Sequence, residues 1–157
     1  MFSPPKHLFP SCPLCTNPSV GHFHSDPKRE YLHCPICDLV FVHPDNFLTQ
    51  EEEHKRYELH NNDPEDLRYR NFLGKLFNPI AERIKPESKG LDFGCGPTPL
   101  LQQMFQERGH DVSIYDAFYA RDTSVFKPKY DFITASEVVE HLYSPKDEFN
   151  RLWACLK

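Results

Sequence analysis

The sequence predicts an α/β protein in three pieces: a small cysteine-containing module over residues 1–46, a helical segment over residues 47–85, and a βαβ unit over residues 86–157. Two Cys-x-x-Cys pairs among prolines predict the first piece. Charged and apolar residues at helical spacing predict the second. A glycine-rich loop between a short apolar run and an amphipathic stretch predicts the third.

The composition is typical of a globular protein. Hydrophobic residues make up 39% and charged residues 26% of the 157 residues, so we expect a packed core. The net charge of −5 provides no basic field, which weakens a nucleic acid partner without excluding it. No run approaches the roughly 20 apolar residues of a membrane helix, and the start lacks the apolar core of a signal peptide. We therefore expect a cytoplasmic protein without a membrane partner, whose six cysteines are reduced.

The cysteine pairs of the first module have the spacing of a metal site. Cys12 and Cys15 are followed, after eighteen residues, by Cys34 and Cys37. Each pair can turn two thiolates toward one tetrahedral zinc ion, and four sulfur ligands leave no open position, so the zinc would be structural. The alternative is a set of buried or redox cysteines. Short strands are expected on both sides of the second pair, as in a zinc ribbon. Nearby histidines can replace a cysteine ligand, although four cysteines already complete the shell; these are His22, His24, His33 and His43.

The middle segment predicts two helices separated by the stretch "NNDP". Asp63 is expected to cap the second helix, with Pro64 at its first position. Three polar or amphipathic residues near the break, Tyr57, His60 and Tyr69, are candidates for a lid or substrate contact; a solvated helix face is the alternative. An apolar stripe along the second helix is expected to pack against the next domain and comprises Leu67, Phe72, Leu73, Leu76, Phe77, Ile80 and Ile84.

The stretch "LDFGCGPTPL" links a strand that ends at Gly94 to a helix for which Thr98 is the expected N-cap. Glycines at such a turn let the backbone approach a ligand. Asp116 closes the next strand, twenty residues after Gly96, where an acid can accept hydrogen bonds from both hydroxyls of a ribose. Pro99 stands where a dinucleotide-binding loop has a small residue. These features indicate a cofactor that contains a nucleoside.

Three segments together resemble class I S-adenosylmethionine-dependent methyltransferases. "LDFGCGPTP" is similar to their first motif, "SIYD" to the end of their second strand, and "YDFITASEVVEHL" to their fourth strand and the turn after it. The resemblance covers roughly residues 88–157 and implies a Rossmann-like core that binds S-adenosylmethionine. The implied contacts are Asp92, Gly94 and Gly96, with Cys95 in the same loop, to the methionine part, Asp116 to the ribose, and Ser136 and Glu137 to the border of cofactor and acceptor.

The cysteine pairs followed by "YELHNN" and "YRNFL" further resemble small methyltransferases that carry a zinc ribbon. Class I methyltransferases have a sheet of seven strands, whereas about four are expected here. The resemblance thus implies a core that is incomplete after the fourth strand, with an edge that favours aggregation or self-association.

The resemblance implies methyl transfer but does not define the acceptor; our first hypothesis is a small molecule of unknown identity. An acceptor that must lose a proton needs a base, and the nearest candidates are His141 and Glu140. Both can equally be packing or capping residues of the helix after the fourth strand. Two alternatives remain open: an RNA methyltransferase, such as one for ribosomal RNA, that uses the ribbon for recognition, and an inactive zinc- and cofactor-binding module.

Overall fold

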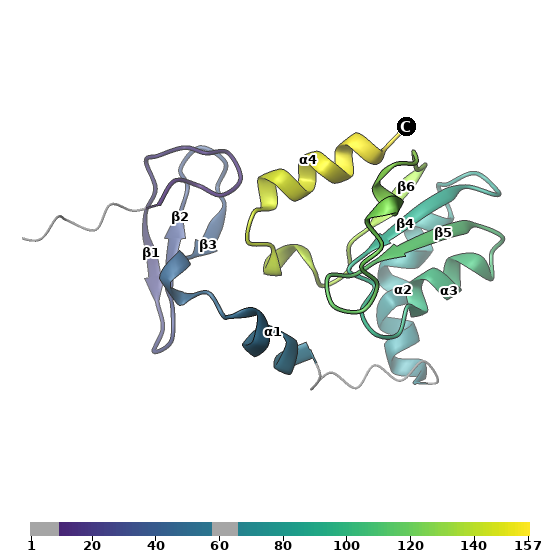
Figure 1. The fold of residues 1–157 in the computed structure, drawn as a ribbon, viewed down its shortest axis with the longest axis horizontal. Coiled ribbons are helices and arrows are strands. Elements are labelled where there is room, and N and C mark those ends of the chain that lie inside the picture. Colours follow the sequence, from purple (N-terminus) through teal and green to yellow (C-terminus); the bar gives the residue numbers. More distant parts are fainter. Residues whose placement is uncertain (1–9, 58–65) are drawn as a thin grey trace, which may run out of the picture. The chain divides into compact units, whose positions relative to one another are not determined.

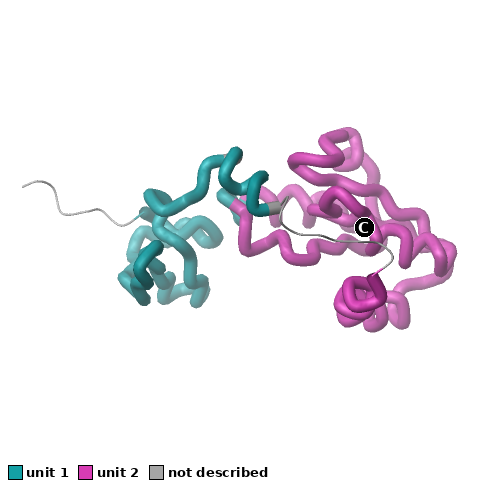
Figure 2. Tube along the Cα trace, turned by 90° about the horizontal axis from the view of Figure 1, so that it is seen from below, with its two compact units in different colours: residues 1–56, 143–146 teal, residues 57–142, 147–157 magenta. Residues whose placement is uncertain are grey.

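A computed structural model describes residues 10–57 and 66–157. The chain forms two compact units, one made of residues 1–56 and 143–146 and the other of residues 57–142 and 147–157 (Figure 2). In the described residues, no helix is both long and apolar enough to cross a membrane.

The first unit contains an antiparallel sheet of three short strands, in the order β1-β2-β3 (Figure 1). β1 spans Gly21–Ser25, β2 spans Glu30–His33 and β3 spans Val40–Val42. The strands predicted around the second cysteine pair are thus confirmed as β2 and β3. β1 was not predicted, because all five of its residues are exposed and carry no alternation of apolar and polar side chains.

Two short helices follow the antiparallel sheet β1-β2-β3, and we refer to this sheet with its cysteine cluster as the ribbon. They are the 3-10 helix η1, Pro44–Asn46, and α1, Gln50–Tyr57. Tyr143 belongs to the same unit: its hydroxyl lies 2.9 Å from the carbonyl oxygen of Leu48 and 3.0 Å from the Glu53 carboxylate. Residues 143–146 are therefore held to the segment between the sheet and α1.

The second unit has a parallel sheet of three strands in the order β5-β4-β6. β4 spans Lys89–Phe93, β5 spans Asp111–Tyr115 and β6 spans Phe132–Thr134. The expectation of about four strands was wrong for this sheet. Between β5 and β6 the chain forms an isolated bridge between Asp116 and Ala120 and the 3-10 helix η2, Thr123–Phe126, which Asp122 caps.

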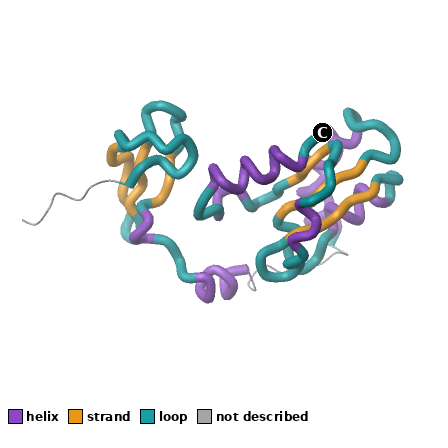
Figure 3. The backbone as a smooth tube through the Cα atoms, turned by 45° about the horizontal axis from the view of Figure 1, so that its top comes forward, coloured by secondary structure: helices purple, strands orange, loops and turns teal. Residues whose placement is uncertain are grey.

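Helices cover both faces of this sheet (Figure 3). α2, Leu67–Ala81, and α3, Leu100–Gln106, pack on one face around the fully buried Phe105. α4, Pro145–Cys155, packs on the other face through Leu152 and Cys155. The 3-10 helix η3, Val139–His141, precedes α4. The unit is therefore a mixed α/β structure with a separate apolar cluster on each side of its sheet.

The helices α2 and α3 have other caps than those expected from the sequence. α2 begins at Leu67, and its N-cap is Asp66, whose carboxylate accepts the Arg68 N–H at 2.8 Å. Asp63 and Pro64 lie outside the described residues. α3 begins at Leu100, and Thr98 makes no capping hydrogen bond, because the N-cap position is taken by Pro99.

The apolar stripe predicted for α2 is only partly buried. Leu73 and Phe77 are buried in the core, and Leu76, Ile80 and Ile84 pack against it. Leu67 and Phe72 are exposed, because Leu67 begins the helix and Phe72 lies outside the face that meets the core.

Candidate functional site

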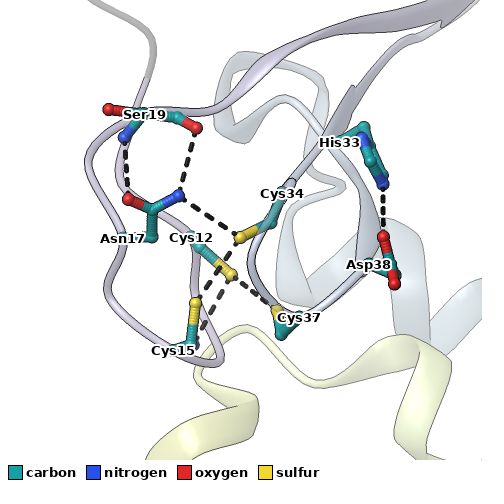
Figure 4. Close-up of polar contacts among 8 residues, drawn as sticks. All are labelled: Cys12, Cys15, Asn17, Ser19, His33, Cys34, Cys37 and Asp38. Atoms are coloured by element: carbon teal, nitrogen blue, oxygen red, sulfur yellow. Dashed lines mark hydrogen bonds and ion pairs between the residues drawn. The ribbon is translucent and has the colours of Figure 1, made fainter.

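The four cysteines of the first unit converge on one point (Figure 4). Their sulfur atoms all lie within 4.8 Å of one another. The Sγ atoms of Cys12 and Cys37 are 3.6 Å apart, and those of Cys15 and Cys34 are 3.5 Å apart. A zinc ion with four sulfur ligands at about 2.3 Å separates those sulfurs by roughly 3.8 Å. The spacing of the thiols therefore fits a tetrahedral zinc ion, and the group contains no histidine.

Hydrogen-bond donors around the cysteines favour ionisation of one thiol first. Burial raises the pKa of Cys34, but the backbone N–H groups of Cys37 and Ile36 and the side chain of Asn17 lower it to about 6. The Asn17 amide lies 3.6 Å from the Cys34 sulfur and is itself held by the Ser19 carbonyl (Figure 4). At Cys37, the backbone N–H of Leu39 lowers the pKa, while burial and the other three sulfurs raise it to about 12. A bound cation would offset this repulsion between thiolates.

In the second unit, the glycine loop after β4 is held against the end of β5. The N–H groups of Gly94 and Cys95 donate to the Tyr115 carbonyl at 2.7 and 3.2 Å. Gly94 and Gly96 have φ of +79° and +67°, which favours glycine at both positions. A Cβ on Gly94 would lie 2.1 Å from the Val138 side chain, whereas a Cβ on Gly96 would meet nothing within 4 Å. Gly94 is thus required by packing, and Gly96 leaves open space at the loop.

Asp116 ties this loop to the residues after β5. Its Oδ2 accepts the Gly96 N–H at 2.9 Å, and its Oδ1 accepts the N–H groups of Phe118 and Tyr119 at 2.8 and 3.1 Å. Each carboxylate oxygen can accept more than one hydrogen bond, so Asp116 can still accept a ligand hydroxyl. The loop is therefore tied to Asp116 through the Gly96 N–H, and the residues after β5 hold the same carboxylate.

Asp92 lies under the loop on the central strand β4. It is 3% exposed, and its Oδ1 accepts the Thr134 hydroxyl at 2.8 Å. Burial raises the pKa of Asp92 to about 6; the Asp116 charge also raises it, and the Thr134 hydrogen bond opposes the rise. Burial, followed by the charges of Asp92 and Asp116, raises the pKa of Cys95 to about 12. Asp92, Cys95 and Asp116 thus form one group of interacting acidic side chains, to which Gly96 is joined by its hydrogen bond to Asp116.

Tyr69, on α2, approaches the same cluster. It is half-buried, and burial followed by the charges of Asp92 and Cys95 raises the pKa of its hydroxyl. Of the other candidates for a lid, His60 lies outside the described residues, and for Tyr57 only the backbone of α1 is described. The structure therefore brings one of the three candidates to the loop.

The turn after β6 carries the remaining candidates. Ser136 is half-buried and Glu137 is exposed, with a positive φ of 55° at Glu137. The next residue, Val138, is the one whose side chain meets Gly94. His141 lies on η3 and is exposed, in contrast to the buried Asp92. This turn thus reaches the glycine loop through Val138.

Two residues of the site were not predicted from the sequence, Thr134 and Val138. Thr134 is paired with Asp92 in the parallel register of β6 and β4, although the two are 42 residues apart in the chain. Its position two residues before Ser136, within the segment that resembles the fourth strand of the family, places Thr134 near the site but does not identify its contact with Asp92.

Comparison with known protein families agrees with this geometry. The family model described as "Methyltransferase domain" matches residues 65–157, which is more than half of the chain. The chain belongs to this methyltransferase family. The matched region includes α2, the glycine loop and the turn after β6, and it supports the resemblance to the S-adenosylmethionine-dependent class. No curated protein and no solved structure matched the chain.

Proposed function

We propose that the methyltransferase domain binds S-adenosylmethionine and transfers its methyl group to a small-molecule acceptor. When bound, this cofactor supplies a methyl group already activated on a sulfonium. The observation that carries the proposal is the loop itself: a Cβ on Gly96 would meet nothing within 4 Å, the Gly96 N–H donates to the buried Asp116, and Asp116 interacts electrostatically with the buried Asp92. An anionic site of this kind suits a cationic ligand that also carries hydroxyl groups.

Each loop residue has a role in this proposal. The Asp92 carboxylate accepts hydrogen bonds from the ammonium group of the methionine part, and Asp116 accepts those of the ribose hydroxyls. Gly94 and Gly96, with Cys95 between them, let the backbone come close to the cofactor. Ser136 and Glu137 border the cofactor and the acceptor, and Tyr69 contacts the bound ligands.

The proton chemistry depends on the acceptor. An acceptor that must lose a proton needs a base, and we assign this role to His141, because histidine is the side chain that most often acts as a general base. The protein otherwise has to align the acceptor with the methyl group and exclude water.

We also propose that the four cysteines hold a structural zinc ion. The sulfur spacing fits this ion, and a shell of Cys12, Cys15, Cys34 and Cys37 leaves no ligand position for water or substrate. The zinc would then stabilise the ribbon and take no part in methyl transfer. The cytoplasmic location expected from the sequence is part of the same proposal, since it keeps these thiols reduced.

Charge favours a small-molecule acceptor over RNA. Residues 10–46 hold only two basic residues, Lys28 and Arg29, against four acidic ones. RNA is the second candidate because of exposed and half-buried rings on the sheet β1-β2-β3: the ring centroids of Phe23 and His33 lie 6.0 Å apart, and the His24 and Tyr31 rings stack at 6.2 Å. Such rings can stack on unpaired bases.

The outer edge of β6 is the proposed site of self-association. The Tyr130 N–H donates to the Cys155 carbonyl at 2.8 Å, and the Lys157 N–H donates to the Tyr130 carbonyl at 3.0 Å. These hydrogen bonds form a parallel bridge between Tyr130 and Leu156. A strand from a second copy of the chain would extend this pairing along β6.

Calorimetry with S-adenosylmethionine tests the function. We expect the native chain to bind, Asp116→Ala to bind about 10- to 100-fold more weakly, and Asp111→Ala to bind like the native chain. Asp111 is a matched control, because it is an exposed aspartate at the opposite end of β5. Thermal unfolding shows whether each variant is folded. Absence of binding by the native chain would eliminate cofactor-dependent function.

Transfer of radioactive methyl groups then separates the remaining possibilities. Methylation of a small-molecule extract supports the proposal, whereas methylation of ribosomal RNA with salt-sensitive binding supports the second candidate. Binding of the cofactor without transfer to either would identify an inactive module.

A further inference from the structure

Thr134 makes a buried hydrogen bond to the acid at the centre of the loop cluster. It ends β6, is 2% exposed and donates its hydroxyl to the Asp92 Oδ1 at 2.8 Å. The parallel register of β6 on β4 places the two residues side by side. A β-branched threonine has few side-chain rotamers, so the hydroxyl is held in one direction by the strand itself.

Each structural element around Asp92 contributes one interacting group. These are Thr134 from β6, Asp116 from β5, Cys95 from the glycine loop and Tyr69 from α2. Asp116, Cys95 and Tyr69 become anions when they ionise, and none of the four groups is a cation. Of these groups, Thr134 is the one that donates a described hydrogen bond to the carboxylate and thereby favours its charged form.

We propose that Thr134 is a positioning residue, whose hydroxyl keeps Asp92 ionised and turns its carboxylate toward the ammonium group of the methyl donor. The proposal rests on the proposed function, because it concerns the same site. The Thr134 hydroxyl donates to Oδ1, which in this proposal leaves Oδ2 to accept the ammonium group of S-adenosylmethionine. Entry of the donor cation also favours loss of a proton from Asp92, which links donor binding to pH.

The first test requires no cofactor. Carbon NMR follows the titration of the Asp92 carboxyl in the ligand-free native chain, in Thr134→Val and in Thr134→Ser. Valine keeps the shape of threonine and removes the hydroxyl that donates the hydrogen bond, whereas serine keeps this hydroxyl. The native midpoint is expected near the Asp92 pKa of about 6. We expect Thr134→Val to raise it by about one pH unit and Thr134→Ser to restore it.

The second test measures donor binding by calorimetry between pH 5 and 8. At pH 7 we expect S-adenosylmethionine to bind Thr134→Val about ten-fold more weakly than the native chain, and Thr134→Ser to recover most of the loss. The part of the deficit that comes from protonation shrinks as the pH rises above the shifted midpoint. A merely structural role would give a deficit that does not change with pH.

The outcomes separate the two proposals. An unchanged titration midpoint and unchanged affinity in Thr134→Val would overturn the role of Thr134 alone. Absence of donor binding by the native chain, with a raised midpoint in Thr134→Val, would overturn the proposed function and leave the effect of Thr134 on Asp92 in place. Should Thr134→Val fail to fold, Thr134→Ala removes the same hydroxyl without branching and gives the same readouts.

Discussion

The two units of the chain contain cores of different kinds. In the ribbon, the buried apolar cluster consists of four residues, and two of them are the cysteines Cys12 and Cys34. In the methyltransferase unit, two larger clusters of aromatic and aliphatic side chains lie on the two faces of the sheet. The proposed zinc ion would complete the first of these cores, whereas a core of phenylalanine and leucine is complete by itself. On this proposal, the two units draw their stability from different sources.

Removal of the proposed zinc ion should have the largest effect on stability, and this effect should be confined to the first unit. Zinc binding contributes on the order of 10 kcal/mol to small domains of this type. We expect a chelator, or Cys34→Ser, to abolish hydrogen-exchange protection in β1 to β3 and to leave β4 to β6 protected. Cys155→Ser is the matched control, since Cys155 is buried in the other unit and should leave the zinc content unchanged. Equal loss of protection in both units would contradict the comparison.

A large-to-small substitution in the core of the methyltransferase unit should produce the reverse pattern, with loss of stability in the second unit and none in the first. Phe105 is fully buried, and its ring lies 4.8 Å from that of Phe77 and 4.7 Å from that of Phe132. We expect Phe105→Ala to lower the free energy of unfolding of this unit by about 3 to 5 kcal/mol. Denaturant unfolding followed by hydrogen exchange measures the change, and zinc content should stay at the native level. Loss of zinc in this variant would show that the units do not fold independently.

Neutralising the buried acid should have the smallest effect, and it should be stabilising. The pKa of Asp92 rises from an ordinary value of 3.8 to about 6 in the folded unit. A raised folded pKa contributes stability that is present below the unfolded pKa and is lost as the pH rises through about 6. At pH 7 we therefore expect Asp92→Asn to raise the free energy of unfolding by about 1 to 3 kcal/mol while it weakens donor binding.

The pH dependence distinguishes this effect from a general change in packing. The gain from Asp92→Asn should shrink as the pH falls through about 6 and vanish only below the unfolded pKa of 3.8, near pH 3, where the Asp92 side chain is protonated in both states. Thermal unfolding between pH 3 and 8 measures this gain. A gain that is constant across this range would contradict the assignment.

The elements with strong patterns could be predicted from the sequence. β4 and β5 were recognised from a short apolar run before a glycine loop and from an acid that closes the next strand, and the family model includes both. β1 could not be predicted, because its exposed residues are held by pairing with β2 and by no burial of their own. The cap at Thr98 was wrong because proline on both sides restricts the backbone there, and the helix starts one residue later than expected.

Contacts that depend on the register of the strands could not be predicted from the sequence. The loop residues were found because they stand together in one motif. Thr134 reaches Asp92 only because β6 lies beside β4 in one particular alignment, and Val138 reaches Gly94 only because the turn after β6 folds back over the loop. Neither distance along the chain nor residue type predicts such a contact.

The three hydrogen bonds that Asp116 accepts have a consequence for the timing of ligand capture. The one from Gly96 fixes the glycine loop to the end of β5, and the two from Phe118 and Tyr119 hold the Asp116 carboxylate in place. The loop is then already ordered before the ligand binds, so ligand binding does not have to supply the free energy for ordering it. Association should consequently follow a single kinetic step whose rate rises in proportion to ligand concentration, as expected for a rigid, preformed receptor.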